Sequence, residues 1–374
     1  MDLDFTQVIA DLGGRLGFFE IARQTRAPAS YLFNRFLPEQ TRPTYDVSTG
    51  SMRIIPTMAG LSGMDSNYAQ VGAMDARTFM ERTAKLTARV PLTENALREI
   101  YAFSQALSSQ GGDVRGWLRG EVEAIFNNVV MQAQLDTMEW LRGQALSVGT
   151  GINWRYDNVS LTVNYGIPAG NVLALRTLAS NAAYGGSASA FWPDVQTAMR
   201  LLRYRVTAFV AHPDTIDTVI HNAANKLRVI GQDTNGGWFD VQRFSGTTEQ
   251  PTGDARDVLR LWSYGLEGEV IDPANPSQTV TVPFLAPGKL IAIGAAGRGG
   301  YVVGMGAQEQ PLDNRPVGYT HIGPTVEGAN VPGRWGRMYV PQERPWELHG
   351  ESVTNGLPVL EDPSKVVIAT TEMA

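Results

Sequence analysis

Apolar residues recur every three or four positions along one long stretch of the sequence, from Asp113 to Gln144. This spacing predicts an amphipathic α-helix. Asp113 can cap the first turn, and the glycines at 149 and 151 follow the far end. The helix would contain about 32 residues and measure about 48 Å, whereas the average helix has only about 11 to 12 residues. A helix of this length acts as a girder for the rest of the fold.

The predicted helix has an apolar and a polar side. The apolar side consists of Val114, Leu118, Val122, Ile125 and Val129, broadened by Phe126, Val130, Leu141 and Ala145. The opposite side consists of Arg119, Glu123, Asn127, Gln134 and Arg142. We therefore expect the apolar side to pack against a core.

Between Tyr45 and Pro91 the pattern becomes that of extended chain. Residues 51–58 form one strand-like run, and a stronger run covers residues 79–90. Apolar and polar residues alternate in the second run, as in a β-strand, and only Arg82 breaks the alternation. The linking residues are rich in glycine, serine and methionine. Because a two-stranded ribbon is marginally stable alone and exposes its edges, we expect it to lie on another surface, such as another subunit.

Shorter patterns fill the rest of the chain. Residues 1–44 contain short helical patterns interrupted by glycine and proline, which is typical of an arm rather than a domain. Thr93 can cap a second helix over residues 92–107. Further on we expect a hairpin over 153–165, helices over 193–202, 215–230 and 255–265, and strands over 205–211, 266–272, 279–285, 289–294, 301–306, 336–340, 346–352 and 365–372.

The composition limits the class of protein. With 374 residues the chain exceeds the size at which one core stops growing, so we expect two structural units or one core with large excursions. The absence of a run of about eighteen apolar residues and of a signal-peptide pattern predicts a cytosolic protein. Zero cysteines exclude disulfides, thiol nucleophiles and cysteine-ligated metals. A net charge of -6 and a pI near 5.4 argue against a dedicated nucleic-acid binder.

Candidate chemistry is sparse in this sequence. The glycine-rich residues 294–300 follow an apolar strand, but their spacing does not match the G-x-G-x-x-G dinucleotide motif, so we interpret them as a turn. Asp217 and His221 stand four residues apart on a predicted helix, yet a metal site would need a third ligand there. No G-x-S-x-G, P-loop or H-E-x-x-H motif occurs. The sequence therefore predicts no catalytic residue, no cofactor and no metal site.

Three local sequences, and the order of the predicted elements, carry a resemblance. YLFNRFLP (31–38) precedes the ribbon, FLAPGK (284–289) leads into the strand at 289–294, and GLPVLEDP (356–363) precedes the last strand. Together with the order of arm, ribbon, capped helix, girder, hairpin, compact α/β unit and β-rich tail, they resemble the major capsid proteins of tailed bacteriophages, particularly the lambda-like gpE family. The resemblance covers nearly the whole chain. It implies an α+β protein with the Hong Kong 97-type phage capsid fold.

The resemblance also implies a division into domains. Residues 1–44 would form the N-terminal arm and residues 45–91 the extended E-loop. Residues 92–205 would form the peripheral domain, with the spine helix at 113–144. Residues 206–334 would form the axial domain near the capsomer centre, and residues 335–374 would return as strands of the peripheral domain.

The implied function is that of a major capsid protein, which assembles itself into pentamers and hexamers of an icosahedral shell around phage DNA and is not an enzyme. The implied partners are further copies of the chain, a scaffold, a portal, a trimeric decoration protein, and double-stranded DNA bound non-specifically on the inner face, with no membrane. The implied location is the virion, after assembly in the host cytoplasm. Two alternatives stay open: a cytosolic α+β hydrolase or transferase with an unrecognised site, and a cargo-enclosing shell protein of the same fold.

Aromatic residues, methionines and one lysine are the subunit-interface residues that this resemblance implies. They are Met58, Met64, Tyr68, Met74, Phe79 and Lys85 in the E-loop, and Phe18, Phe19, Tyr31, Phe33 and Phe36 in the arm. Some members of this fold join an E-loop lysine to a neighbour's asparagine with the help of a glutamate, and Lys85, Asn355 and Glu361 supply these three residue types. The lambda-like resemblance implies non-covalent reinforcement instead, so we expect no cross-link.

Overall fold

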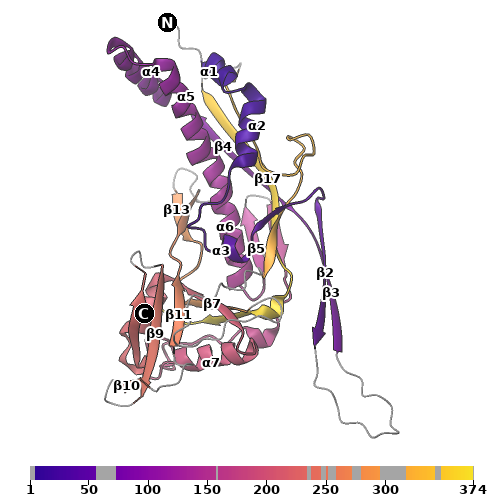
Figure 1. The fold of residues 1–374 in the computed structure, drawn as a ribbon, viewed down its shortest axis with the longest axis vertical. Helices are drawn as coiled ribbons and strands as arrows, with labels where there is room; N and C mark the ends of the chain where they lie inside the picture. The colour runs from indigo at the N-terminus through magenta and orange to yellow at the C-terminus, as the bar shows by residue number, and fades with distance from the viewer. Residues whose placement is uncertain are drawn as a thin grey trace.

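The computed structural model describes residues 5–55, 73–156, 159–233, 237–245, 250–251, 258–271, 279–294, 317–341 and 347–373. One long helix runs through the body, a first sheet lies along it, a second sheet lies at its foot, and a β-ribbon projects from the side (Figure 1). The predicted mixture of helices and strands is confirmed.

The girder is one continuous helical stretch whose geometry changes in the middle. It comprises α5 (Val114–Ile125), the π-helical segment η1 (Phe126–Met131) and α6 (Gln132–Ser147). Asp113 caps α5 as predicted, since its carboxylate accepts a hydrogen bond from the Gly116 N–H at 3.0 Å. The predicted long helix is therefore confirmed, but it is not α-helical throughout.

The π-helical segment decides which side chains face the core. A π-helical turn holds an extra residue, so the sequence neighbours Val130 and Met131 are both fully buried. Val129 is 44% exposed, and Ile125 is half-buried. The predicted place of Val129 on the core side is wrong, because a strict α-helical period cannot anticipate an inserted residue.

Two glycines allow the first sheet to approach this segment closely. A Cβ on Gly350 would lie 2.5 Å from Val130 Cγ2, and a Cβ on Gly336 would lie 2.5 Å from Phe126 Cζ. Ser352 also donates a hydrogen bond to the Val130 carbonyl at 3.0 Å. Helix and sheet are therefore in close contact along the π-helical segment.

Substitutions at two neighbouring positions test this geometry. We expect Val129→Asp to change the free energy of unfolding by no more than about 0.5 kcal/mol, as surface substitutions usually do. We expect Val130→Asp to abolish folding, because it would bury an unpaired carboxylate at a close contact between helix and sheet. Thermal melting of both variants beside the parent measures the difference, and equal melting temperatures for the two would contradict the π-helical geometry.

Polar residues of α6 are buried, contrary to the prediction for Gln134 and Arg142. Both of these side chains, and that of Glu139, lie in the interior. The cause is that β17 (Leu348–Leu360) and α3 (Phe33–Phe36) pack around α6, so this half of the girder has no solvent side. Buried polar groups need partners, and those of α6 find them in distant parts of the chain.

The first sheet has five strands, and β17 is its central strand. They are β1 (Glu39–Thr41), β4 (Ala84–Leu92), β15 (Gly318–Ile322), β16 (Trp335–Tyr339) and β17. β15 and β16 pair with one edge of β17 and β4 with the other, while β1 runs parallel to β15. The end of the N-terminal arm is thus a strand of this sheet.

The second sheet has seven strands and carries its own apolar core. Its strands are β7 (Val206–Ala211), β8 (Leu227–Gln232), β9 (Trp238–Ser245), β10 (Gln250–Pro251), β11 (Val258–Ser263), β14 (Lys289–Gly294) and β18 (Val366–Thr370). The helices α7 (Phe191–Leu201) and α8 (Pro213–His221) pack against them. β7 and β11 are parallel, and the other pairs are antiparallel.

Hairpins and short helices complete the fold. The hairpins are β2 (Asp46–Ile55) with β3 (Ala73–Arg82), β5 (Ile152–Tyr156) with β6 (Val159–Val163), and β12 (Glu267–Ile271) with β13 (Thr279–Pro283). The remaining helices are α1 (Phe5–Asp11), α2 (Gly14–Gln24), α4 (Glu94–Ser109) and the short η2 (Ala169–Asn171), η3 (Ala223–Asn225) and η5 (Pro363–Lys365). The predicted hairpin over 153–165 and the helix after Thr93 are confirmed.

Two predicted helices contain strands instead. The helix over 215–230 ends at His221 and gives way to β8, and the described part of 255–265 is β11. Leu259 and Leu261 are buried while Arg260 between them is only half-buried, so the period over this short run is two. The predicted strand at 301–306 lies outside the described residues.

The sheets divide the chain differently from the predicted domain ranges. β15 precedes residue 334 but belongs to the first sheet, and β18 follows residue 335 but pairs with β14 in the second. α7, which precedes residue 206, packs on the second sheet. β4 is likewise part of a sheet rather than of the ribbon, because the extended run of 79–90 breaks at Thr83 and changes its pairing partner there. Pairings between distant strands leave no local trace in the sequence.

Candidate assembly surfaces

The ribbon of β2 and β3 projects from the body of the molecule (Figure 1). Its strands pair at ten positions, from Asp46 opposite Arg82 to Ile55 opposite Ala73, and Figure 1 shows them projecting from the body. Near the root, Val47 is buried in the main core, whereas Met80 is 76% exposed. Because isolated two-stranded ribbons are marginally stable in water, this one needs a surface to lie on.

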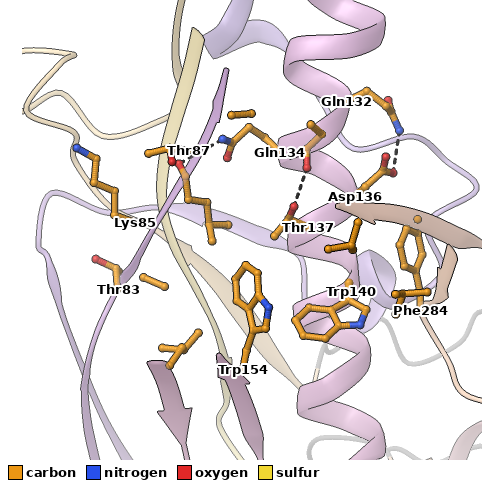
Figure 2. Close-up of a pocket in the computed structure, with 18 of the residues that line it drawn as sticks. Thr83, Lys85, Thr87, Gln132, Gln134, Asp136, Thr137, Trp140, Trp154 and Phe284 are labelled. Carbon is orange, nitrogen blue, oxygen red and sulfur yellow. Dashed lines mark hydrogen bonds between the residues drawn. The ribbon is translucent and has the colours of Figure 1, made fainter. Parts of the chain in front are cut away.

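A groove of about 1670 Å³ lies between the ribbon root, the girder and two hairpins. Figure 2 shows α6 along it with Gln132, Asp136 and Trp140, β4 on one side and Trp154 of β5 below. The β12 hairpin and Phe284 line the opposite side. The groove therefore joins segments that are far apart in the sequence.

Two polar side chains of the groove, Asp136 and Gln132, are hydrogen-bonded to Tyr31 of the arm. The Tyr31 hydroxyl donates to Asp136 Oδ1, and Gln132 Nε2 donates to the same carboxylate at 3.0 Å and to the Tyr31 oxygen at 2.6 Å. Burial, and then the hydrogen bond to Asp136, raise the pKa of the Tyr31 hydroxyl. This cluster fastens the arm to α6 and is not arranged as a nucleophile with its base.

Apolar side chains form much of the remaining groove surface. Trp140 and Trp154 meet edge to face with ring centroids 5.3 Å apart. Val129 and Val270 at the rim are exposed, the latter by 38%. The Trp140 Nε1 is buried, and no described residue accepts a hydrogen bond from it. Contiguous exposed apolar surface of this kind is typical of a protein–protein contact.

The part of the chain that the structure describes contains no candidate metal site. No group of three or more metal-ligating side chains comes together there. The His221 Nδ1 lies 2.9 Å from Asp217 on the exposed surface of α8. None of the described helices is long and apolar enough to cross a membrane.

The aromatic residues predicted to reach neighbouring subunits from the arm lie in this chain's own core. Phe18, Tyr31, Phe33 and Phe36 are buried, and Phe19 is half-buried. Phe18 packs against Phe126 at a centroid distance of 5.0 Å. In this conformation the four buried side chains pack within their own chain, and their contact with a neighbouring subunit stays a prediction.

An ion-pair network explains why the arm stays on the body. Arg142 is 0% exposed and donates to Thr320 Oγ1 at 2.8 Å, to Glu139 Oε2 at 2.9 Å and to Glu39 Oε1 at 2.8 Å. Glu39, in β1, also accepts from Arg334. Burial alone would raise the pKa of the Glu39 carboxyl, but the guanidinium groups of Arg334 and Arg142 outweigh it and hold that pKa below its ordinary value.

Glu139, the second carboxylate of the network, is hydrogen-bonded to the first residue of α3. Glu139 Oε1 accepts hydrogen bonds from the Phe33 N–H at 2.8 Å and from the Tyr264 hydroxyl at 2.7 Å. Burial, and then the neighbouring Glu139, raise the pKa of Tyr264. The sequence analysis did not single out Glu39, Glu139 or Arg334. One feature of the sequence could have indicated this ion pair: Glu139 and Arg142 interrupt an apolar part of the girder and stand three residues apart, on the same side of a helix.

The predicted E-loop residues are only partly described. Met58, Met64 and Tyr68 lie outside the described residues, and Met74 and Phe79 are described as strand positions of β3 without their side chains. Lys85 lies in β4, where it faces Asn355 of β17 in register. Its Nζ lies 2.5 Å from Glu327 Oε1, and Asn355 donates to the Pro324 carbonyl at 2.5 Å.

The described part of the chain thus combines a long helix, a ribbon that projects beside it and a separate sheet at its foot. No protein-family model and no curated protein matches the sequence. Among solved structures, the chain is similar to a candidate capsid protein of a prophage from E. coli CFT073, with a TM-score of 0.53, 13% identity and 100% coverage of both chains. This match shows that the chain has the Hong Kong 97-type phage capsid fold.

Two further structures are similar at lower scores. A phage-related protein from Bordetella bronchiseptica RB50 has a TM-score of 0.46 and 12% identity, over 94% of this chain and 95% of that one. The capsid of Myoviridae phage XM1 has a TM-score of 0.40 and 12% identity, over 93% of this chain and 94% of that one.

Proposed function

We propose that this chain is a major capsid protein, whose copies assemble into a closed shell around phage DNA. The observation that carries the proposal is a ribbon of ten paired positions that stands clear of its own subunit, in a chain with the capsid fold. In the shell, the ribbon of one copy would lie on its neighbour and bury the surface that it now exposes. Such contacts supply the interface area that a stable assembly needs.

The finer features of the assembly belong to the same proposal. The copies form pentamers and hexamers, a scaffold and a portal take part in assembly, and a trimeric decoration protein reinforces a lambda-like shell. Double-stranded DNA contacts the inner face non-specifically, and the mature subunit resides in the virion. A cargo-enclosing shell of the same fold would use the same surfaces. The enzyme alternative gains no support from the groove, because Asp136 and Gln132 are already bonded to Tyr31.

Light scattering of the purified protein at increasing concentration tests the proposal. A shell subunit gives masses of capsomers or larger assemblies, at multiples of 40.7 kDa. A single species of 40.7 kDa at every concentration and salt condition would contradict it.

We further expect a shell without covalent cross-links. Within one subunit the Lys85 amine is held by Glu327, and an isopeptide bond needs a deprotonated amine beside a correctly placed acid. Boiled, denatured assemblies should run as one band near 40.7 kDa. A ladder of higher bands that is absent from Lys85→Ala would overturn this expectation.

A further inference from the structure

The direction in which the ribbon leaves the subunit is fixed at its root. The Tyr45 carbonyl accepts hydrogen bonds from both the Thr83 N–H and the Thr83 hydroxyl, each at 3.1 Å, and so ties the two ends of the ribbon together. The His321 Nε2 donates to the Thr44 carbonyl at 2.8 Å. These bonds attach the root to β15 of the first sheet.

Side chains of one turn contact the chain at the ribbon root. Residues 325–330 connect β15 to β16, and Asn330 Oδ1 accepts a hydrogen bond from the Tyr45 hydroxyl at 2.6 Å. From the same turn, Glu327 binds the Lys85 Nζ at 2.5 Å, just beyond the other end of the ribbon. The turn therefore holds the chain on both sides of the ribbon root.

The backbone of this turn is built to hold that position. Ala329 and Asn330 have φ values of 56° and 61°, a left-handed conformation that residues with a Cβ rarely adopt in succession. The Asn330 N–H donates to the Thr325 carbonyl at 2.9 Å, and the Gly328 N–H to the Thr325 hydroxyl at 3.2 Å. Thr325 is itself buried, and Pro324 forms a β-bridge with Pro332. A turn needed only as a connection would more easily carry glycine at the left-handed positions.

We infer that the turn of residues 325–330 is a positioning element that sets the angle between the ribbon and the body of its own subunit. Asn330 acts on this angle through its hydrogen bond with Tyr45. The inference rests on the proposed function in one respect: the angle matters because the ribbon must meet a neighbouring copy. Every subunit of a closed shell then presents its ribbon already aimed at the neighbour, which lowers the entropy lost on binding.

The natural absence of cysteine allows a direct measurement of this angle. Spin labels at Arg77→Cys, which lies opposite Ser51 and away from the ribbon root, and at Leu175→Cys on the body report one distance by pulsed electron paramagnetic resonance. Leu175 is exposed and lies in a segment attached to the body through the β-bridges of Val172 with Ile368 and of Arg176 with Thr371. The measurement is made on unassembled subunits.

We expect a narrow distance distribution for the parent and a broader one for Tyr45→Phe and Asn330→Gly. Glycine at 330 removes the acceptor without straining the backbone, and phenylalanine at 45 removes only the donor. The two changes together should broaden the distribution no further, because they delete the two ends of one bond. Asn330→Asp keeps an acceptor oxygen and should restore the parent distribution.

Asp46→Asn serves as the control, because it weakens the exposed ion pair with Arg82 inside the ribbon and leaves the turn untouched. Parent-like distributions for both Tyr45→Phe and Asn330→Gly would overturn the inference, as would equal broadening in the control. Melting curves confirm that each labelled variant is folded. Because the distance is read without assembly, a failure of the chain to form shells and a failure of the turn to set the angle give separate results.

Discussion

Replacing residues 51–77 by a two-residue Asn-Gly turn will give a folded subunit that no longer closes into shells. Gly50 and Thr78 are register partners in the ribbon, so a type I′ turn can join them without changing the pairing below. The root contacts of Val47 and Tyr45 are kept. The shortened chain loses the element that would cover a neighbour, while its core stays the same.

Two measurements on this variant separate folding from assembly. The melting temperature should stay close to that of the parent, because Val47 is the only described ribbon side chain in the main core cluster. Electron microscopy should show capsomers or single subunits where the parent gives shells. Normal shells from the shortened chain would mean that the ribbon makes no necessary contact between subunits.

Arg142→Met will destabilise the isolated subunit more than any surface charge substitution. The change leaves the Glu139 and Glu39 carboxylates buried with less compensation, and removing one partner of a buried ion pair costs about 3–5 kcal/mol. For a chain of this length that corresponds to a fall in melting temperature of about 4–6 °C. The first sheet, the arm and the girder should loosen together, because the network joins all three.

Arg98→Met provides a matched control for this experiment. Arg98 forms an exposed ion pair with Glu94 at 2.7 Å, four residues away on α4. Such a pair contributes only about 0.3–0.5 kcal/mol, so its loss should hardly move the melting temperature. Equal melting of Arg142→Met and Arg98→Met would contradict the assigned role of the buried network.

The same network predicts how stability depends on pH. The pKa of Glu39 is lowered in the folded chain, so Glu39 contributes stability above its ordinary pKa of 4.5, and this contribution is lost as pH falls through the lower folded value. Arg142→Met removes one of the two cations and should raise the folded pKa, so less of this contribution remains to be lost. Melting temperatures are measured from pH 7 to pH 3. Through the contribution of Glu39, the melting temperature of the variant should fall less steeply below pH 4.5 than that of the parent.

The parts of the fold that local pattern can specify were predicted well. Leu118, Val122 and Phe126 follow a helical period and are buried as expected, and the hairpin of β5 and β6 follows its alternation. The capsid fold itself came from the order of elements and three short local sequences, and the prophage structure supports it. The regular period failed at η1, the π-helical segment that the glycines of β16 and β17 allow the sheet to approach closely.

The rest depended on contacts between residues far apart in the sequence. Arg142 meets Glu39 across 103 positions, and Tyr45 meets Asn330 across 285. No local period records such pairs, so Gln134 and Arg142 of α6 were predicted on the polar side, whereas both are buried. The ribbon was recognised in part, since residues 51–55 and 79–82 belong to it whereas residues 84–90 pair with β17.

Negative-stain electron microscopy of the purified full-length protein tests the shell-forming role most directly. The parent chain should give closed shells, tubes or ring-shaped capsomers of uniform size. A uniform population of small compact particles, unchanged by concentration, salt or a crowding agent, would contradict the role of this chain as a shell subunit.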